Sequence, residues 1–364
     1  MSDLVLSVSR QNESCSSATS AWTEDPPEQA AAWNNRLLHA EACFKQFPYW
    51  NEPYRSRWIR PRYLACISAG EPSAYACVLE VRLPGLRIGL ILRGPVSLVL
   101  NTTVSQSALQ ALHAWALTEG FDLLRYTHDD GPLLAEIAAL NESRRVESFP
   151  FLTDGYDELI VDQLEEDERM LASFDREARR KIRRASEAGY QIESSSCPDA
   201  IDEVWPLYRA SALRKGYSLR RPRIAYKEMV RLAQPHGCAR VYKVNLDGRL
   251  VETCLVFRDR ETAFCVLAAM DAEALRNLPS PSVLMHWRAM RDFFRMGARR
   301  YNFSWGGGSL ARFKNQFSPR LQTYPPPVTL ILRPRVCRVW LDVIMPLLRG
   351  AEGSLGRILS WAGR

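Results

Sequence analysis

The chain contains two kinds of hydrophobic run. Runs that alternate or are rich in β-branched residues indicate strands, and runs with helical spacing indicate helices. The same order of these runs occurs twice along the chain. Turn residues such as Gly70-Glu71-Pro72-Ser73 separate two β-favouring runs and predict a hairpin. Apolar residues at helical spacing predict a helix that ends at Gly120. The first series is a hairpin, a third strand, a helix and a fourth strand, over residues 62–82, 86–92, 107–120 and 121–126.

The second half of the chain repeats this order. Its hairpin turns at Asp247-Gly248, a dipeptide that favours two-residue hairpin loops. The second series is again a hairpin, a third strand, a helix closing at Gly297 and a fourth strand, over residues 241–257, 263–269, 282–296 and 300–303. The pattern predicts a duplicated α/β domain, with two unrelated runs that share an order as the alternative.

Length and charge narrow the class of protein. A chain of 364 residues is longer than one hydrophobic core usually organises, so two domains are expected. The formal net charge of +7 and the isoelectric point near 9.0 favour an anionic partner, such as a phosphate group, a nucleic acid or an acidic membrane surface.

The N-terminal residues lack the basic-then-apolar pattern of a signal peptide, and no apolar run is long enough to span a bilayer. A cytoplasmic protein is therefore expected. Nine cysteines without a Cys-x-x-Cys pair and five scattered histidines favour reduced thiols over disulfides and predict no metal site.

Residues 299–317, RRYNFSWGGGSLARFKNQF, have the strongest character of a binding site. A predicted strand breaks into Gly306, Gly307 and Gly308, whose backbone can approach a ligand closely and direct its N–H groups toward it. Lys314 then supplies a cation between Phe313 and Phe317.

Three stretches resemble the Fem family of non-ribosomal aminoacyl- and peptidyltransferases and the related BioF2-like acetyltransferases. They are the arginine-led run 179–189, the Tyr301-Asn-Phe strand with its glycines, and Arg312-Phe313-Lys314 with Phe317. The resemblance covers about residues 30–333. It departs from the family at Asn302, where an aspartate is common, and at Ser318-Pro319, where a glycine is common. The long helical arm of some cell-wall members has no counterpart.

The resemblance implies an α/β (α+β) chain of tandem GNAT-like domains, each a mixed, mostly antiparallel sheet flanked by helices. We accordingly divide the chain into a flexible tail (1–29), a first domain on the acceptor side (30–150), a catalytic second domain (151–333) and an amphipathic basic tail (334–364). The implied activity is transfer of an aminoacyl or acyl group to an amine of an anionic acceptor. The donor would be aminoacyl-tRNA or acyl-CoA, with no covalently bound cofactor.

Within this frame Lys314 is the candidate catalytic residue, because its charge could stabilise the oxyanion of acyl transfer. The candidate binding residues are Arg179, Arg183, Trp305, Gly306, Gly307, Gly308 and Phe313. Apolar residues 171, 174, 178, 182 and 185 share one stripe of the basic helix, and Arg176, Arg179 and Arg183 gather on its flank, as phosphate recognition requires. The alternatives are a solvated basic face and a lysine that lies along apolar surface.

The C-terminal segment 336–364 is amphipathic and basic, which suits either packing against the domain or peripheral contact with the inner face of an anionic membrane. tRNA is the expected macromolecular partner if the donor is aminoacyl-tRNA. A nucleic-acid-binding protein and a non-catalytic GNAT scaffold remain as alternatives from other classes, since fold alone does not separate an enzyme from a scaffold.

Overall fold

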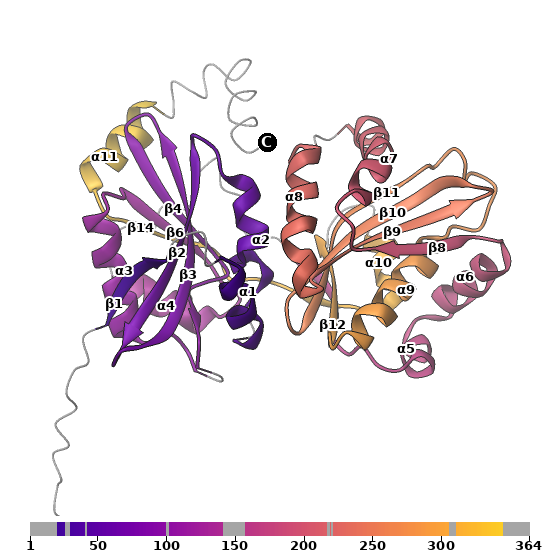
Figure 1. The fold of residues 1–364 in the computed structure, drawn as a ribbon, viewed down its shortest axis with the longest axis horizontal. Helices are drawn as coiled ribbons and strands as arrows, with labels where there is room; N and C mark the ends of the chain where they lie inside the picture. The colour runs from indigo at the N-terminus through magenta and orange to yellow at the C-terminus, as the bar shows by residue number, and fades with distance from the viewer. Residues whose placement is uncertain are drawn as a thin grey trace, which may run out of the picture.

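The computed structural model describes residues 20–25, 30–40, 42–99, 102–140, 157–216, 219, 221–305 and 311–344. These residues form two mixed β-sheets with helices between them and on their outer faces (Figure 1).

The first sheet has the strand order β1-β2-β3-β4-β6-β14, and β5 also pairs with β3. Neighbouring strands are antiparallel except β4 and β6, which are parallel over residues 88–92 and 123–127. Its strands are β1 (Ala21–Asp25), β2 (Ile59–Ser68), β3 (Glu71–Leu83), β4 (Leu86–Leu92), β5 (Val96–Ser97), β6 (Leu123–Thr127) and β14 (Val328–Ile331).

The second sheet has the order β13-β7-β12-β11-β10-β9-β8, with β11 and β12 as its parallel pair. Asp247 and Gly248 both have positive φ, so the hairpin turns where the sequence predicts it. Its strands are β7 (Glu158–Val161), β8 (Gln191–Ser195), β9 (Ala239–Leu246), β10 (Arg249–Arg258), β11 (Thr262–Met270), β12 (Arg300–Trp305) and β13 (Arg320–Gln322).

The predicted repeat is confirmed, and the two copies exchange a strand. In each copy an antiparallel hairpin and third strand lead through a helix to a strand parallel to the third. β7 follows the first copy in sequence but pairs with β12 of the second sheet, and β14 follows the second copy but pairs with β6 of the first. The exchange therefore anchors a strand that follows each copy in the sheet of the other copy.

The helices form three layers around the sheets. The larger helices are α1 (Ala30–His39), α3 (Gln106–Thr118), α4 (Gly131–Ala139), α5 (Asp167–Ser173), α6 (Arg176–Glu187), α7 (Ala200–Lys215), α8 (Arg223–Ala233) and α9 (Ser282–Arg295). Shorter ones are η2 (Phe44–Gln46), α2 (Pro48–Asn51), η3 (Glu52–Tyr54), η4 (Gln234–His236), α10 (Ala311–Lys314), η6 (Asn315–Phe317), α11 (Pro334–Val339) and the π-helical η7 (Trp340–Ile344). None of the described helices has the length and apolar character needed to cross a bilayer.

One continuous apolar core lies between the sheets. It combines α1 and α2 of the first copy with α7 and α8 of the second, and Figure 1 shows α2 beside α8 at the centre of the molecule. A second core lies beneath α6 and α9, and a third beneath α3 and α4. Ala178, Ile182 and Ala185 of α6 are buried, as the apolar stripe of the basic helix predicts. Phe174 is buried too, but Leu171 is only partly buried, and the expected single helix breaks between Ser173 and Arg176.

Two expected domain boundaries differ from the structure. Residues 21–25, placed in the N-terminal tail, form edge strand β1 of the first sheet. Residues 328–331, placed in the second domain, form β14 of the first sheet. Local patterning does not reveal these differences, because an edge strand of four or five residues is short and its pairing partner lies far away in sequence.

The described part of the C-terminal segment packs on the first sheet. Cys337 and Trp340 are buried against Leu86, Ile88 and Leu123, and Trp340 Nε1 donates to Pro84 O at 3.1 Å. Residues 334–344 therefore complete the first domain. The rest of the segment, from residue 345, lies outside the described residues.

Replacing Trp340 with alanine is expected to lower the free energy of unfolding by about 3–5 kcal/mol, since a buried tryptophan is lost and a cavity remains. Urea unfolding followed by circular dichroism measures the change. Val339→Ala is the matched control, because Val339 is 54% exposed and should change stability by less than about 0.5 kcal/mol. Equal effects of the two substitutions would show that this segment does not stabilise the domain.

Candidate active site

The parallel strands β11 and β12 separate shortly after they begin. They pair only over Thr262–Phe264 and Arg300–Asn302, although β11 continues to Met270 and β12 to Trp305. Ser304 has a φ of +58°, and the register of β12 against β7 shifts between Asn302 and Trp305. The Ser304 hydroxyl donates to Cys265 O at 2.8 Å and fixes the bend where the strands diverge.

Lys314 lies against this bend. Its side chain is 8% exposed, and Nζ donates to Phe303 O at 2.8 Å. Burial lowers the pKa of Lys314, while Cys265 and the nearby Glu158 carboxylate act in the opposite direction. The short helix α10 thus brings an ammonium group to the backbone of β12 next to the point where the strands part.

A polar network connects this bend to the first domain. Asn302 Oδ1 accepts from Ser304 N at 2.6 Å, and Asn302 Nδ2 donates to Glu158 Oε2 at 2.7 Å. Tyr324 Oη donates to the same carboxylate oxygen at 2.5 Å. Arg93 of the first domain lies with its guanidinium carbon 3.5 Å from the centre of the Tyr324 ring and 3.6 Å, at Nη2, from Glu158.

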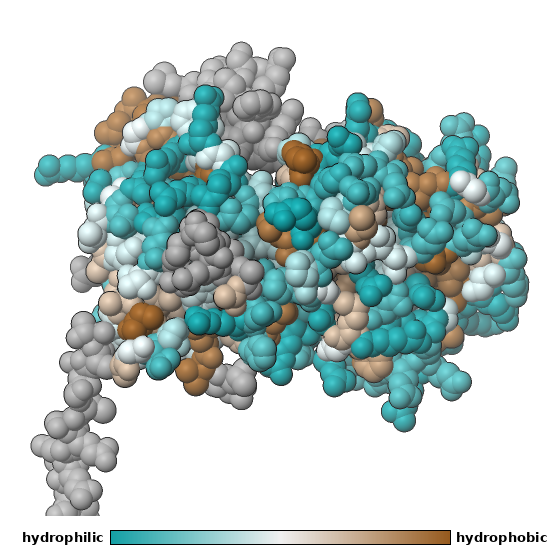
Figure 2. Space-filling view, in the orientation of Figure 1, coloured by the Kyte–Doolittle hydropathy of each residue, from teal (hydrophilic) through white to brown (hydrophobic). Residues whose placement is uncertain are grey.

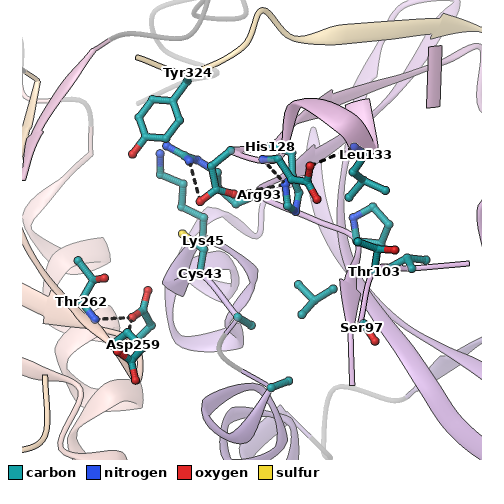
Figure 3. Close-up of a pocket in the computed structure, with 18 of the residues that line it drawn as sticks. Cys43, Lys45, Arg93, Ser97, Thr103, His128, Leu133, Asp259, Thr262 and Tyr324 are labelled. Carbon is teal, nitrogen blue, oxygen red and sulfur yellow. Dashed lines mark hydrogen bonds and ion pairs between the residues drawn. The ribbon is translucent and has the colours of Figure 1, made fainter. Parts of the chain in front are cut away.

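The network borders a cavity of about 360 Å³ between the two domains. In Figure 3, Arg93, Lys45 and Tyr324 converge at one end, and Asp259 and Thr262 of the second domain lie across from the first-domain residues. The charged lining comprises three basic and five acidic side chains, Lys45, Arg93 and Arg300 with Asp129, Asp130, Glu158, Asp259 and Glu261. This balance suits a ligand that carries an ammonium group.

Two titratable groups in the cavity are shifted toward their neutral forms. Burial raises the pKa of Asp259 to about 7, although its Oδ1 accepts hydrogen bonds from the N–H groups of Glu261 and Thr262. Burial also lowers the pKa of His128, whose Nδ1 accepts from Asp130 N at 2.9 Å. The carboxylate of an acid with a pKa near 7 is suited to accept a proton from an attacking amine at neutral pH.

The part of the chain that contains the divergent strand pair is similar to known proteins. Residues 172–315 match the family model of the acetyltransferase (GNAT) domain. The second domain is a GNAT-type domain. Among solved structures, FemX has 16% identity and a TM-score of 0.71, over 88% of this chain and 99% of FemX. No curated protein sequence matches the chain.

Two further solved structures have 12% identity to this chain. L-PGS from Bacillus licheniformis matches with a TM-score of 0.54, over 84% of this chain and 92% of its own. The C-terminal domain of a proposed lysylphosphatidylglycerol synthetase from Agrobacterium fabrum matches with a TM-score of 0.52, over 86% of this chain and 98% of its own. At these identities the likeness establishes the fold, which confirms the predicted pair of GNAT-like domains.

Some of the predicted site residues of the GNAT domain lie near the strand divergence, and others lie away from it. Phe313 packs with His286 and Phe317, at ring-centre distances of 5.6 and 5.7 Å, so it anchors the helix that carries Lys314. Trp305 is the last residue of β12, and its role in binding stays a prediction. Gly306, Gly307 and Gly308 lie outside the described residues, so their role in binding the donor stays a prediction.

Arg179 and Arg183 lie on the exposed side of α6 and do not line the cavity. Nη1 of Arg179 donates to the carbonyl oxygens of Ala172 and Phe174, at 3.0 and 2.7 Å, and so ties the end of α5 to α6. Arg179 therefore has a structural contact that the sequence does not reveal. Lys181 on the same helix donates to Gln316, which places α6 beside the segment that follows Lys314.

Replacing Arg179 and Arg183 together with glutamine is expected to weaken binding of a phosphate-bearing donor, and wild-type affinity should fall between 50 and 200 mM salt. Fluorescence anisotropy with labelled charged tRNA measures both effects. Arg183→Gln alone separates charge from the structural contact of Arg179, and Arg184→Gln is the control on the same helix. An affinity indifferent to salt and to both substitutions would leave α6 as a solvated basic face.

A cluster of potential metal ligands lies in the core of the GNAT domain. The ligand atoms of Cys254, Cys265 and His286 lie within 4.8 Å of one another, and all three residues are buried. His286 Nδ1 is 2.8 Å from Tyr301 Oη, and burial together with the Lys314 charge lowers the pKa of His286 to about 3. The imidazole is therefore neutral, engaged by tyrosine and surrounded by phenylalanine rings, as expected of a core histidine.

Glu252 on β10 is a buried carboxyl group at the start of α9. The Ser282 hydroxyl donates to its Oε1, and Oε2 has no hydrogen-bond partner among the described residues. Burial raises the pKa of Glu252 from its ordinary value of 4.5 to about 8. A carboxyl group whose pKa is higher in the folded protein than in the unfolded chain stays protonated up to a higher pH in the folded protein. Its stabilising effect is therefore lost as the pH rises toward 8.

Wild-type protein is expected to lose up to about 2 kcal/mol of stability between pH 6.5 and 8 relative to Glu252→Gln. Below pH 6.5 the buried His113 and His286, whose pKa values are lowered to about 4 and 3, have the opposite effect, so the comparison uses the window above 6.5. Asp259, with a pKa of about 7, also titrates there but contributes equally to both proteins. Urea unfolding at several pH values tests this. The exposed Glu136→Gln is the control, and parallel pH profiles of wild type and Glu252→Gln would contradict the expectation.

Sequence reasoning did not identify Glu158, Asp259 or Tyr324. Asn302 drew attention only through the family resemblance. Arg93 has a φ of +57°, and a Cβ on Gly94 would lie 2.6 Å from the Gln46 side chain. The Arg-Gly pair is thus the local signal of a tight, strained turn that directs a cation into the cavity.

Proposed function

We propose that the protein is an N-acyltransferase that transfers an aminoacyl or acyl group from an activated donor to the amino group of an acceptor. The observation that carries the proposal is the convergence on one strand, β12, of three features: the divergent parallel pair, the buried ammonium of Lys314, and the cavity between the domains. The match of residues 172–315 to the acetyltransferase domain family supports the reaction class.

In this proposal the acceptor amine enters the cavity beside its carboxyl groups. Glu158 and Asp259 hold the ammonium form, and Asp259 accepts the proton that the amine loses. The neutral amine attacks the ester or thioester carbonyl of the donor, and the carbonyl oxygen becomes negative. Lys314 stabilises this oxyanion until the C–O or C–S bond to the leaving group breaks. The attached nitrogen gives up its surplus proton to the leaving oxygen or sulfur, so the products are the amide and the free donor alcohol or thiol.

The acidic balance of the cavity refines the expected acceptor. An anionic acceptor would place its amine near Asp259 and its negative group near Arg93 or Lys45, which lie across the cavity from Asp259. For the donor we favour aminoacyl-tRNA over acyl-CoA, since the arginine-led helix and Phe313-Lys314 resemble the Fem family. The names of the lysylphosphatidylglycerol synthetase structures also indicate aminoacyl transfer within this fold.

The test is a comparison of donors. Purified protein is incubated with acetyl-CoA and, in parallel, with charged tRNA, in the presence of candidate amines, while loss of the thioester or aminoacyl ester is followed by mass spectrometry. Consumption of charged tRNA supports the proposal as stated. Consumption of acetyl-CoA alone would overturn the donor and retain the acyltransferase, whereas inertness toward every donor would indicate a binding scaffold.

Peripheral membrane contact through the C-terminal segment is a secondary proposal, supported by the basic and apolar residues of 345–364. Because residues 334–344 belong to the fold of the first domain, the appropriate truncation ends at Ile344. Wild type, but not this truncation, should sediment with phosphatidylglycerol vesicles, and less so at high salt. Equal sedimentation of both proteins would remove the segment from membrane binding.

A further inference from the structure

A second and larger hollow lies on another side of the contact between the two domains. It has a volume of about 1,040 Å³ and is bounded by η3 and the start of β2 from the first domain and by α7, α8 and their connection from the second. The cavity at β12 shares none of its lining residues. We call it the α7–α8 groove.

Arg221 on the α7–α8 connection lines this groove and is 6% exposed. Its guanidinium carbon lies 4.1 Å from the ring centre of Trp50 and 3.8 Å from that of Tyr54, so both aromatic rings of the first domain contact it. Nη1 donates to the thioether sulfur of Met229 at 2.8 Å. Among the described residues no carboxylate forms an ion pair with Arg221, and burial lowers its pKa to about 9.

A buried cation without a counter-charge is unfavourable, because contacts with aromatic rings and a sulfur atom replace only part of the lost hydration. A guanidinium group has five N–H donors in a planar fork that matches carboxylate and phosphate oxygens. The Arg221 donors that border the groove are therefore best satisfied by an anion that enters it.

The rest of the groove is mainly apolar with a basic rim. Leu213 is 78% exposed and Ile224 is 68% exposed, and Figure 2 shows a hydrophobic patch at one end of α8 within hydrophilic surface. The apolar lining further includes Trp58, Ile59, Trp205, Leu219 and Ala225. The charged lining is five arginines, Arg55, Arg57, Arg209, Arg221 and Arg223, against Glu52 and Glu228.

The two glutamates of the groove are already paired with arginines. Glu52 binds Arg55 and Glu228 binds Arg231, both at side-chain distances of a direct ion pair. Arg57 stacks on Trp58 with its guanidinium carbon 4.8 Å from the ring centre. Arg223 is paired with Asp202 outside the groove, so the excess positive charge comes from Arg57, Arg209 and Arg221. Together with the exposed apolar side chains, this charge fits an amphiphile with a negative head.

We propose that the α7–α8 groove binds a single-chain amphiphile with an anionic head group, a long-chain fatty acid or a monoalkyl phosphate. The carboxylate or phosphate oxygens accept hydrogen bonds from Arg221, and the alkyl chain lies against Trp205, Leu213 and Ile224. This site is separate from the acyl-transfer site and does not depend on the proposed function.

Isothermal titration calorimetry of the full chain with laurate and with dodecyl phosphate, each below its micelle-forming concentration, tests the proposal. We expect one molecule of at least one of them to bind per chain, and the stronger of the two identifies the head group. Dodecyltrimethylammonium has the same chain with a positive head and should not bind, and inorganic phosphate, which lacks the chain, should bind far more weakly.

Arg221→Gln should weaken amphiphile binding about 10- to 100-fold, the loss expected when a charge-assisted hydrogen bond is removed. Arg240→Gln is the control, because Arg240 does not line the groove and its hydrogen bond is to Ser194, which also lies outside it. Leu213→Asp combined with Ile224→Asp places charge against the chain at two exposed positions. This variant should fold normally and also weaken binding, so the test does not depend on the stability of Arg221→Gln.

The proposal is overturned if wild-type protein binds neither laurate nor dodecyl phosphate, or if the cationic amphiphile binds equally well. It is also overturned if affinity is unchanged in both groove variants. If the protein truncated after Ile344 still sediments with phosphatidylglycerol vesicles and no monomer binds, the groove would be assigned to a membrane surface instead. None of these outcomes bears on acyl transfer, which is measured separately with the donor assay.

Discussion

Replacing Lys314 with methionine is expected to lower kcat about 10²–10³-fold, the loss typical of removing one group that stabilises an oxyanion. The ammonium of Lys314 lies at the divergence of β11 and β12, where the carbonyl of the donor would be held. Methionine keeps most of the buried volume but removes the charge. The fold should survive, since methionine retains the packing of the buried chain and the loss of the hydrogen bond to Phe303 O costs about 1 kcal/mol.

Steady-state kinetics with the donor identified in the comparison above measures this effect, and circular dichroism confirms folding. Lys181→Met is the matched control, because Lys181 lies on the adjacent α6 and donates to Gln316 rather than to β12. Normal turnover by a folded Lys314→Met protein would exclude the lysine from the chemistry. A raised KM with unchanged kcat would assign it to binding instead.

Replacing Arg93 with glutamine is expected to raise the KM for the amine acceptor about tenfold or more and to lower the free energy of unfolding by about 1–3 kcal/mol. Arg93 is the cation of the first domain that faces Glu158 and Tyr324 of the second. Its loss leaves a buried carboxylate with one fewer positive neighbour. The stability change stays moderate because Asn302 and Tyr324 still donate to Glu158.

Arg82→Gln is the control for this substitution. Arg82 also pairs with a buried carboxylate, that of Glu80, and Glu80 would keep Arg87 as a partner in this variant. Arg82 does not line the cavity. The acceptor KM should therefore be unchanged in this variant. If Arg93→Gln destabilises the protein without altering the acceptor KM, the Arg93 network is a domain contact and not part of the acceptor site.

The candidate site was predictable only in part. Lys314 and Phe313 belong to one short helix next to a strand and a glycine run, so their spacing and the family resemblance were enough to select them. Glu158, Asp259 and Tyr324 carry no such local pattern. They meet because β7 pairs with β12, the β10–β11 turn faces the first domain, and the chain after β13 passes Arg93.

For the basic helix, the sequence predicted the buried side but not the contacts of its arginines. Periodicity correctly predicted which side of α6 is buried, since an apolar stripe must face a core. It did not predict that Arg179 would bond the carbonyl groups of Ala172 and Phe174. A side chain's partner depends on where the preceding turn directs the backbone, and amino-acid spacing does not encode that direction.

The sequence by itself determined the duplicated order of hairpin, strand, helix and strand, because hydrophobic periodicity and turn residues act over a few positions. Tertiary structure decided the exchange of β7 and β14 between the sheets, the network from Arg93 to Asn302, and the enclosure of Arg221 between Trp50 and Tyr54. These features depend on strand pairing and packing between residues far apart in the chain. Such contacts form only when both copies fold against each other, so no local pattern carries them.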